Sequence, residues 1–311
     1  MTLRTLLAGC ACILVLAVSV RPASAHGFVG KRFFPATLVI DDPFVADELS
    51  LPTVSYIKTP DGKETDFEFE FSKRITANFG VSVNETLIRL IAPGQTPRTG
   101  FGNLEVGGKY QFILSEVHET ILSLGLDAEI GGTGRKAVGA DSFSTFTPAL
   151  FYGKGFGDLP EPVSFLRPLA VTGVLGVALP TKAKSVTVTD DDSEIERHPH
   201  VLQWGFAIEY SIPYLQSVVK DVGLPAPFNR MIPVIELSFQ TPLDRGQGGK
   251  TTGTVNPGII WAGQFFQIGL EAIIPINDRS GKNVGVIGQL HFFLDDLFPK
   301  IFGRPLFGGG A

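Results

Sequence analysis

The stretch FGNLEVGGKYQFIL, from Phe101 to Leu114, decides the fold. Polar and apolar residues alternate along it, with Glu105, Lys109 and Gln111 interleaved among Val106, Tyr110 and Phe112. A period of two places successive side chains on opposite faces of a β-strand. The stretch therefore predicts a strand with one polar and one apolar face.

The same alternation recurs along the chain, for example in 66–72, 122–129, 202–210, 235–240 and 266–272. A helical repeat of 3.6 residues does not explain such a set. The pattern predicts an all-β fold, an antiparallel transmembrane β-barrel over residues 51–294. We expect twelve strands, near 51–60, 64–73, 75–91, 100–114, 119–131, 143–153, 167–179, 200–213, 231–243, 252–262, 265–275 and 283–294.

A soluble β-sandwich also alternates, so the membrane interpretation needs further support. The expected strands run to roughly 10–14 residues, whereas soluble strands are mostly about 5–6. Aromatic residues such as Trp204, Tyr210 and Trp261 gather toward strand ends, which is typical of an interfacial girdle. An even number of strands predicts both chain termini on the periplasmic side, with 181–199 as the longest outer loop and a short helix at 215–222 in an inner connection.

The first residues predict a cleaved secretory signal, residues 1–25. Arg4 supplies the positive charge, Leu6–Val20 is apolar, and Ala23-Ser24-Ala25 is a small-x-small cleavage site. The segment Leu7–Cys10 also resembles a lipoprotein acylation motif, but the apolar run continues well past it. We expect residues 26–50 to form an N-terminal plug or a periplasmic segment, and 295–311 a periplasmic C-terminal tail.

Cysteine content and charge exclude several classes of protein. Cys10 and Cys12 are the only cysteines and both fall in the predicted signal, so the mature protein has no disulfide scaffold and no cysteine nucleophile. The net charge of −5 gives no basic footprint for nucleic-acid binding. Mean hydropathy of +0.21 with 36 Gly and 22 Pro indicates a turn-rich, ordered chain.

The segment from Phe101 to Tyr110 resembles the Gly-x-Gly-Asp-Leu-x-x-Gly-x-Lys-Tyr motif of bacterial outer-membrane barrels named after the meta-cleavage pathway of phenol degradation. Phe71–Val81, Ala178–Thr181 and Pro257–Trp261 are similar to further segments of that family, and Asn103 stands where the family has Asp. The resemblance implies an outer-membrane channel, distantly like fatty-acid and aromatic-hydrocarbon porins, with no catalytic residues.

The polar face of the strands predicts an acidic lumen, which favours cations or zwitterions over anions. Lys109 and His291 are the expected basic residues on this face, with Arg89 a further candidate. The alternative is that the acidic groups pair with Arg and Lys from loops or a plug in a closed interior. The expected inward-facing carboxylates are Asp66, Glu68, Glu70, Glu105, Asp127, Glu129, Glu209, Glu236 and Glu271.

We therefore expect a channel of the cell outer membrane for a small organic solute, hydrophobic or aromatic in character, with outer-membrane lipid, lipopolysaccharide and the barrel-assembly machinery as partners. The alternatives are a non-conducting structural or surface-interaction barrel and, less favoured, an enzyme, because His118, His198 and His200 sit in no recognisable catalytic pattern. We expect no cofactor and no metal: the acidic run Asp190–Asp192 is more simply a solvated loop.

Overall fold

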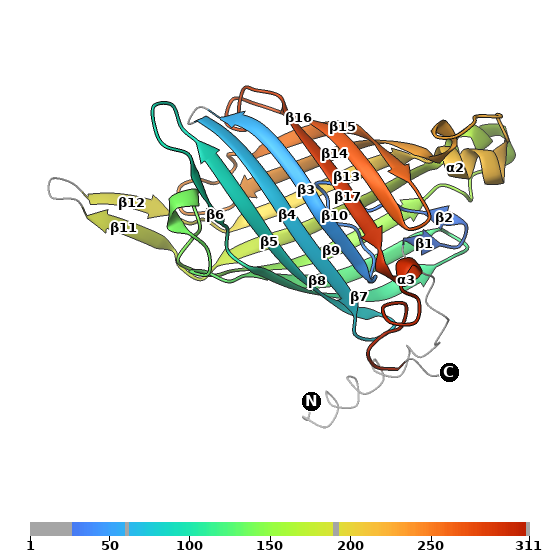
Figure 1. Ribbon diagram of the computed structural model, residues 1–311, viewed down its shortest axis with the longest axis horizontal. Coiled ribbons are helices and arrows are strands. Elements are labelled where there is room, and N and C mark those ends of the chain that lie inside the picture. The colour runs from blue at the N-terminus through green and yellow to red at the C-terminus, as the bar shows by residue number, and fades with distance from the viewer. Residues whose placement is uncertain (1–26, 60–61, 189–192, 309–311) are drawn as a thin grey trace, which may run out of the picture.

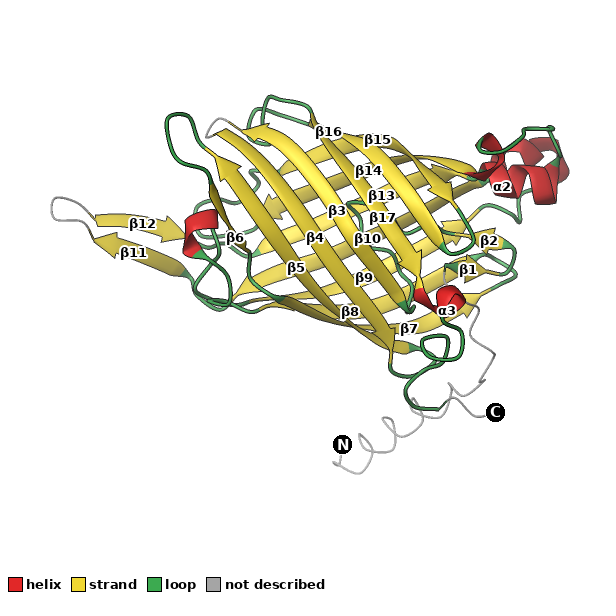
Figure 2. Ribbon diagram, viewed as in Figure 1, coloured by secondary structure: helices red, strands yellow, loops and turns green. Residues whose placement is uncertain are grey.

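The structure is a computed structural model that describes residues 27–59, 62–188 and 193–308. The predicted signal peptide, the alternative acylation motif and the acidic run Asp190–Asp192 lie outside the described residues. The chain folds into a closed antiparallel β-barrel (Figures 1 and 2). Its wall strands are β3 (Glu48–Thr59), β4 (Gly62–Arg74), β5 (Phe79–Ile91), β6 (Arg98–Phe101), β7 (Glu105–Ser115), β8 (Thr120–Glu129), β9 (Thr145–Gly155), β10 (Leu169–Pro180), β13 (Val201–Tyr210), β14 (Met231–Pro242), β15 (Thr252–Ala262), β16 (Phe266–Pro275) and β17 (Gly285–Phe293).

Closure follows from the strand pairings. Apart from β6 and β7, consecutive wall strands pair with each other, and β17 pairs with β3, so the sheet meets itself. β6 and β7 both pair with β5 and share one position in the wall, which makes twelve positions. The predicted twelve-stranded antiparallel barrel is confirmed.

Smaller elements lie at the two ends of the barrel. Two short hairpins, one at each end, accompany a few helical turns. These elements are β1 (Phe28–Val29), β2 (Arg32–Phe33), η1 (Lys136–Val138), η2 (Glu161–Leu166), β11 (Lys184–Val188), β12 (Ser193–Arg197), α2 (Ile212–Tyr214), η3 (Leu215–Val219), η4 (Phe228–Arg230) and α3 (Leu294–Leu297). None of these helices has the length and apolarity that a helix needs to cross a membrane, as far as the described part of the chain goes.

Several predicted boundaries differ from the structure. β3 begins at Glu48 rather than at 51, and β5 begins at Phe79 rather than at 75 because residues 75–78 form a turn. The expected strand 100–114 is interrupted between β6 and β7, where Asn103 turns away to donate to Glu129 and to the carbonyl of Asp141. The expected short helix at 215–222 is present with shifted bounds, since α2 and η3 together cover Ile212–Val219.

The two ends of the barrel are unlike. The β1–β2 hairpin, α2 and α3 gather at one end, and the β11–β12 hairpin projects from the other (Figure 1). We call these the β1 end and the β11 end. The sequence pattern anticipated the loop 181–199 but not the hairpin within it, because five-residue strands that pair only with each other leave a weak signal.

The outer surface of the wall is apolar. Large hydrophobic side chains stay exposed along the strands, as lipid-facing residues of a transmembrane barrel do. They include Phe71, Val81, Val83, Val106, Tyr110, Phe112, Leu124, Leu126, Leu175, Ile208, Ile235, Ile259, Ile268, Leu270, Ile274 and Val286.

Candidate functional site

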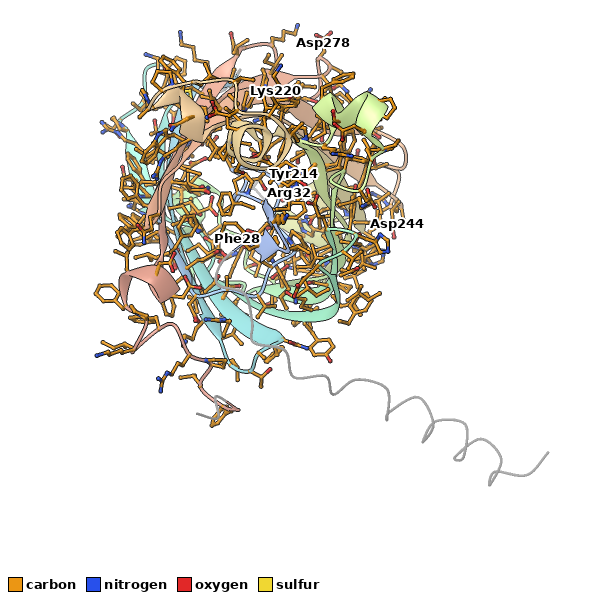
Figure 3. All side chains as sticks on the ribbon, turned by 90° about the vertical axis from the view of Figure 1, so that its right-hand side faces the viewer. Phe28, Arg32, Tyr214, Lys220, Asp244 and Asp278 are labelled. Atoms are coloured by element: carbon orange, nitrogen blue, oxygen red, sulfur yellow. The ribbon has the colours of Figure 1, made fainter. Side chains whose placement is uncertain are left out.

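An N-terminal segment, residues 27–47, lies inside the barrel at the β1 end. Val29 and Phe34 pack in one buried cluster with Ile121 of β8 and Ala170 of β10. Figure 3 looks into this end and shows Phe28 and Arg32 within the ring of strands. Leu38 packs in a second cluster, with Ala207, Ile232, Val234, Ile260 and Ile287 from the inner faces of β13, β14, β15 and β17. The segment thus fills this half of the lumen with apolar side chains.

Two inward-facing glycines give the segment room. A Cβ atom at Gly205 of β13 would lie 2.4 Å from the Ile40 side chain, and one at Gly269 of β16 would lie 2.4 Å from the Leu38 side chain. At both positions a larger residue would require the side chain of the segment to shift. The lumen wall is therefore shaped to the segment at these two places.

Gly269→Val tests this fit. We expect the added side chain to displace Leu38, because overpacking a filled core costs roughly 1–3 kcal/mol. Limited proteolysis should then cleave the N-terminal segment several times faster than in the unchanged protein, while the heat-dependent gel shift of the folded barrel persists. Gly248→Val, in the loop after β14 where the nearest atom is 3.4 Å away, is the matched control. Equal cleavage of both variants would contradict the fit.

Glu236 of β14 binds the backbone of the segment. Its carboxylate accepts hydrogen bonds from the backbone N–H groups of Leu38 (2.6 Å), Val39 (3.0 Å) and Ile40 (2.6 Å). Glu236 is fully buried, so these bonds act without competition from water. The buried side chains of Gln267 and Ser123 also donate to the segment, at the carbonyls of Ala36 and Pro43.

Arg32 ties the segment to the β1 end. Its guanidinium is fully buried, donates to Glu119 (3.1 Å) and to the carbonyl of Pro168 (2.8 Å), and lies 3.8 Å from the centre of the Tyr214 ring. The Tyr214 hydroxyl donates to the same Glu119 carboxylate at 2.8 Å. Burial and this bond raise the pKa of Tyr214 to about 12. Arg32 and Tyr214 lie side by side in Figure 3.

Ion pairs also fix the C-terminal end of the segment. Asp47 is fully buried and accepts hydrogen bonds from the side chains of Lys73 and Arg74, both at 2.8 Å. Lys73 also donates to the carbonyls of Phe302 and Arg304 in the C-terminal part of the chain. Removing one partner of a buried ion pair is costly, so residues 32 and 47 act as fixed points for the stretch between them.

The rest of the lumen is a cavity of about 440 Å³. It reaches Glu105 and Thr145, where β7 and β9 begin, and Glu129, where β8 ends, all toward the β11 end. The segment from Ala36 to Ala46 bounds it on the other side. Seven of the predicted lumen residues line it: Glu68, Glu70, Glu105, Lys109, Asp127, Glu129 and His291.

Cationic groups in this cavity are already paired. Lys109 donates to Asp41 (3.0 Å) and to the carbonyl of Asp42 (2.5 Å), and its ammonium lies 4.5 Å from the centre of the Phe151 ring. His291 lies 2.8 Å from the Ser50 hydroxyl and 3.4 Å from the Glu48 carboxylate. The other lining carboxylates make no ion pair with a described side chain, so the cavity wall is acidic.

The remaining predicted residues lie elsewhere on the inner face. Asp66 accepts from Ser55 outside the cavity lining. Glu209 is buried beside Thr172, and Glu271 is buried next to Glu236, under the segment. Arg89 does not face inward: on the unbroken register of β5 it shares a face with the exposed Val81 and Val83, so that expectation is wrong.

Asp42 is a titratable group of the segment that lines the cavity beside Asp41. Burial, and secondarily the Glu48 carboxylate, raise the pKa of Asp42 to about 7, against the opposing effect of Lys109. Its carboxylate accepts the backbone N–H of Phe44 at 2.8 Å. The docked state of the segment is therefore more stable when Asp42 is protonated than when it is ionised.

The structure also places the other candidate residues. His118 lies beside Asp158, His198 beside Ser185, and His200 beside Asp244. Among the described residues, no group of three or more His, Cys, Asp or Glu side chains is arranged to hold a metal ion. Arg32, Gly205, Gly269, Gln267 and Ser123 were not singled out from the sequence, because their partners lie far away along the chain.

Comparison with solved structures finds outer-membrane proteins with the fold of this barrel. The COG4313 outer membrane channel from Pseudomonas putida F1 is similar, with a TM-score of 0.56 and 11% sequence identity over 84% of this chain and 99% of that chain. The KdgM porin (TM-score 0.46, 12% identity, 78% of this chain and 98% of that chain) and the NanC porin (0.46, 8%, 78% and 98%) also match.

No protein-family profile and no curated protein sequence matches the chain. The resemblance to the phenol-degradation family thus stays a prediction. At 11% identity, the likeness to the Pseudomonas channel concerns the fold alone. The closed, twelve-stranded antiparallel barrel of this chain therefore shares its fold with an outer-membrane channel.

Proposed function

We propose that the protein is an outer-membrane channel for a small organic solute, with the N-terminal segment as its plug. The carrying observation is the acidic cavity, open toward the β11 end and bounded by a segment that enters the lumen. A volume of about 440 Å³ is in the range of small-molecule sites. The longer loops and the β11–β12 hairpin favour the β11 end as the outer side, since outer loops are the longer ones in such barrels.

The acidic wall favours a solute that carries a positive charge, a cation or a zwitterion. Glu68, Glu105 and Asp127 stand without a cationic partner among the described side chains, and carboxylate rings select for cations in pores. The apolar surfaces of Phe44 and Phe151 in the same cavity offer contact to a hydrophobic or aromatic body. The expected partners of an outer-membrane barrel are outer-membrane lipid, lipopolysaccharide and the barrel-assembly machinery.

Flux measurements in liposomes test the channel. Protein with the plug loosened by Gly269→Val should pass small organic cations faster than organic anions of equal size, and faster than the unchanged protein. The alternative, a non-conducting structural barrel, is favoured by the filled apolar half of the lumen. Absence of flux in both proteins, with folded barrels shown by the heat-dependent gel shift, would support that alternative and end the channel proposal.

Asp42 makes plug docking depend on pH. Its raised pKa belongs to the docked state, so docking is strongest when Asp42 is protonated and weakens as the pH rises from about 4 to about 7. We expect protease cleavage of the plug to become faster over this window and to level off above it. Asp42→Asn, which stays neutral, should lose that part of the pH dependence. An identical pH profile for both proteins would contradict the assignment.

A further inference from the structure

Basic residues lie on the outer face of the wall at the β11 end, across β3, β4 and β5. Ser55 and Asp66 bond to each other on the inner face, so their chain neighbours Tyr56 and Thr65 face outward. Two residues further along each strand, Lys58 and Lys63 also face outward, and they are direct partners across the β3–β4 pair. These three strands lie next to one another in Figure 1.

Arg89 completes the group. It is the register partner of Thr65 on β4 and of Thr99 on β6, and therefore lies in the row next to the two lysines. Lys58, Lys63 and Arg89 are all exposed. We call these three residues the rim patch. Hydroxyl groups of Tyr56, Thr65 and Thr99 stand in the same row as Arg89.

The next outward row below the rim patch is apolar. By the same register, the next outward row consists of Val54, Phe67, Leu87 and Phe101, and the last of these is 51% exposed. The row after it pairs Phe69 with Glu85, and beyond that row Val83 and Phe71 form another exposed apolar pair. The outward side chains change from apolar to basic between two adjacent rows. This change marks where the lipid-facing surface would meet the headgroup region.

The rim patch has a charge excess that the described protein does not balance. Like charges directly opposite each other on neighbouring strands are destabilising. None of the three side chains forms an ion pair with a described carboxylate. Asp61, in the turn between the two lysines, lies outside the described residues and is therefore included in the test. An external anion at this height would remove the repulsion.

We propose that the rim patch binds the phosphate groups of the phosphorylated glycolipid in the outer leaflet, with the acyl chains against the apolar rows below. The proposal rests on the outer-membrane placement with the β11 end outward. Cations and hydroxyl groups form charge-assisted hydrogen bonds with phosphate, and the Arg89 guanidinium can make two of them in parallel. Continuity of the patch with the lipid-facing wall distinguishes this ligand from free phosphate, which needs no apolar rows.

The test measures binding of purified lipopolysaccharide to the full-length barrel in neutral-lipid nanodiscs. The variant with Lys58→Ala, Lys63→Ala and Arg89→Ala should bind about 100-fold more weakly, because each basic residue near an anionic lipid surface contributes about a factor of five. Lys184→Ala with Arg197→Ala is the matched control: this pair is also directly opposed and exposed, but on the projecting hairpin. It should bind like the unchanged protein.

Three further measurements separate the possible outcomes. Unchanged protein should bind enzymatically dephosphorylated lipopolysaccharide at least about tenfold more weakly than the intact lipid, and inorganic phosphate should compete only in large excess. Asp61→Asn should bind as tightly as the unchanged protein or more tightly. Equal binding by the triple variant and the control, or indifference to lipid phosphates, would overturn the site. Recovery of the protein outside the membrane would instead overturn the placement on which the site rests.

Discussion

Glu236→Ala is expected to release the plug and raise the conductance of the barrel at least about tenfold. The buried carboxylate accepts three backbone N–H groups of the plug, and hydrogen bonds to a charged group are each worth roughly 1.5–3 kcal/mol. Without the Glu236 carboxylate, the three backbone N–H groups of the plug have no acceptor in this buried site. Even one such bond is worth about a tenfold change in the docked population.

Single-channel recording in planar bilayers checks this expectation. Glu271→Gln is the control, since Glu271 is buried next to Glu236 but accepts no hydrogen bond from the plug. It keeps the three bonds to Glu236 and should leave the conductance close to that of the unchanged protein. Should Glu271→Gln open the barrel as much as Glu236→Ala, the charge of the pair would matter and the hydrogen bonds would not.

Neutralising the cavity wall is expected to remove its preference for cations. The variant combines Glu68→Gln, Glu105→Gln and Asp127→Asn, three carboxylates that line the cavity without a cationic partner. A unit charge attracts a cation 4 Å away by about 1 kcal/mol in water, so three of them, partly screened, correspond to roughly a tenfold change in the cation-to-anion permeability ratio.

Reversal potentials across a salt gradient measure that ratio, in barrels opened by Gly269→Val. The control combines Glu161→Gln, Asp221→Asn and Asp278→Asn, which changes the net charge equally at exposed positions outside the cavity. The control should keep the cation preference. If both variants lose it alike, the selectivity arises from the charge of the whole protein and not from the cavity wall.

The wall of the barrel follows from local sequence. Alternation in segments such as Phe101–Leu114 fixes which side chains share a face, because a strand has no other way to arrange them. Register between neighbouring strands then carries this assignment around the barrel, which is why twelve strands were found despite boundary errors of a few residues. Arg89 shows the limit: outside the clearest alternation, its face was assigned wrongly.

The plug contacts could not be read from the sequence in the same way. Glu236 and its partner Leu38 are 198 residues apart, and Arg32 and Glu119 are 87 apart. No local period links such pairs. Gly205 and Gly269 lie on the predicted polar faces of their strands. Only the positions of Leu38 and Ile40 show why small residues are suited to these two places. The sequence of this part of the chain does contain Phe33, Phe34 and Phe44, and such apolar residues outside the strands need an apolar partner.

Reversible locking of the plug tests the central claim most directly. Leu38→Cys with Gly269→Cys places two thiols where the side chain at 38 already contacts the wall at 269, in a mature chain expected to have no other cysteine. The expected result is a low conductance under oxidising conditions that rises several-fold, with a cation preference, when the same barrels are reduced. A conductance that is the same oxidised and reduced, with the disulfide shown to form, would contradict an acidic channel closed by its N-terminal segment.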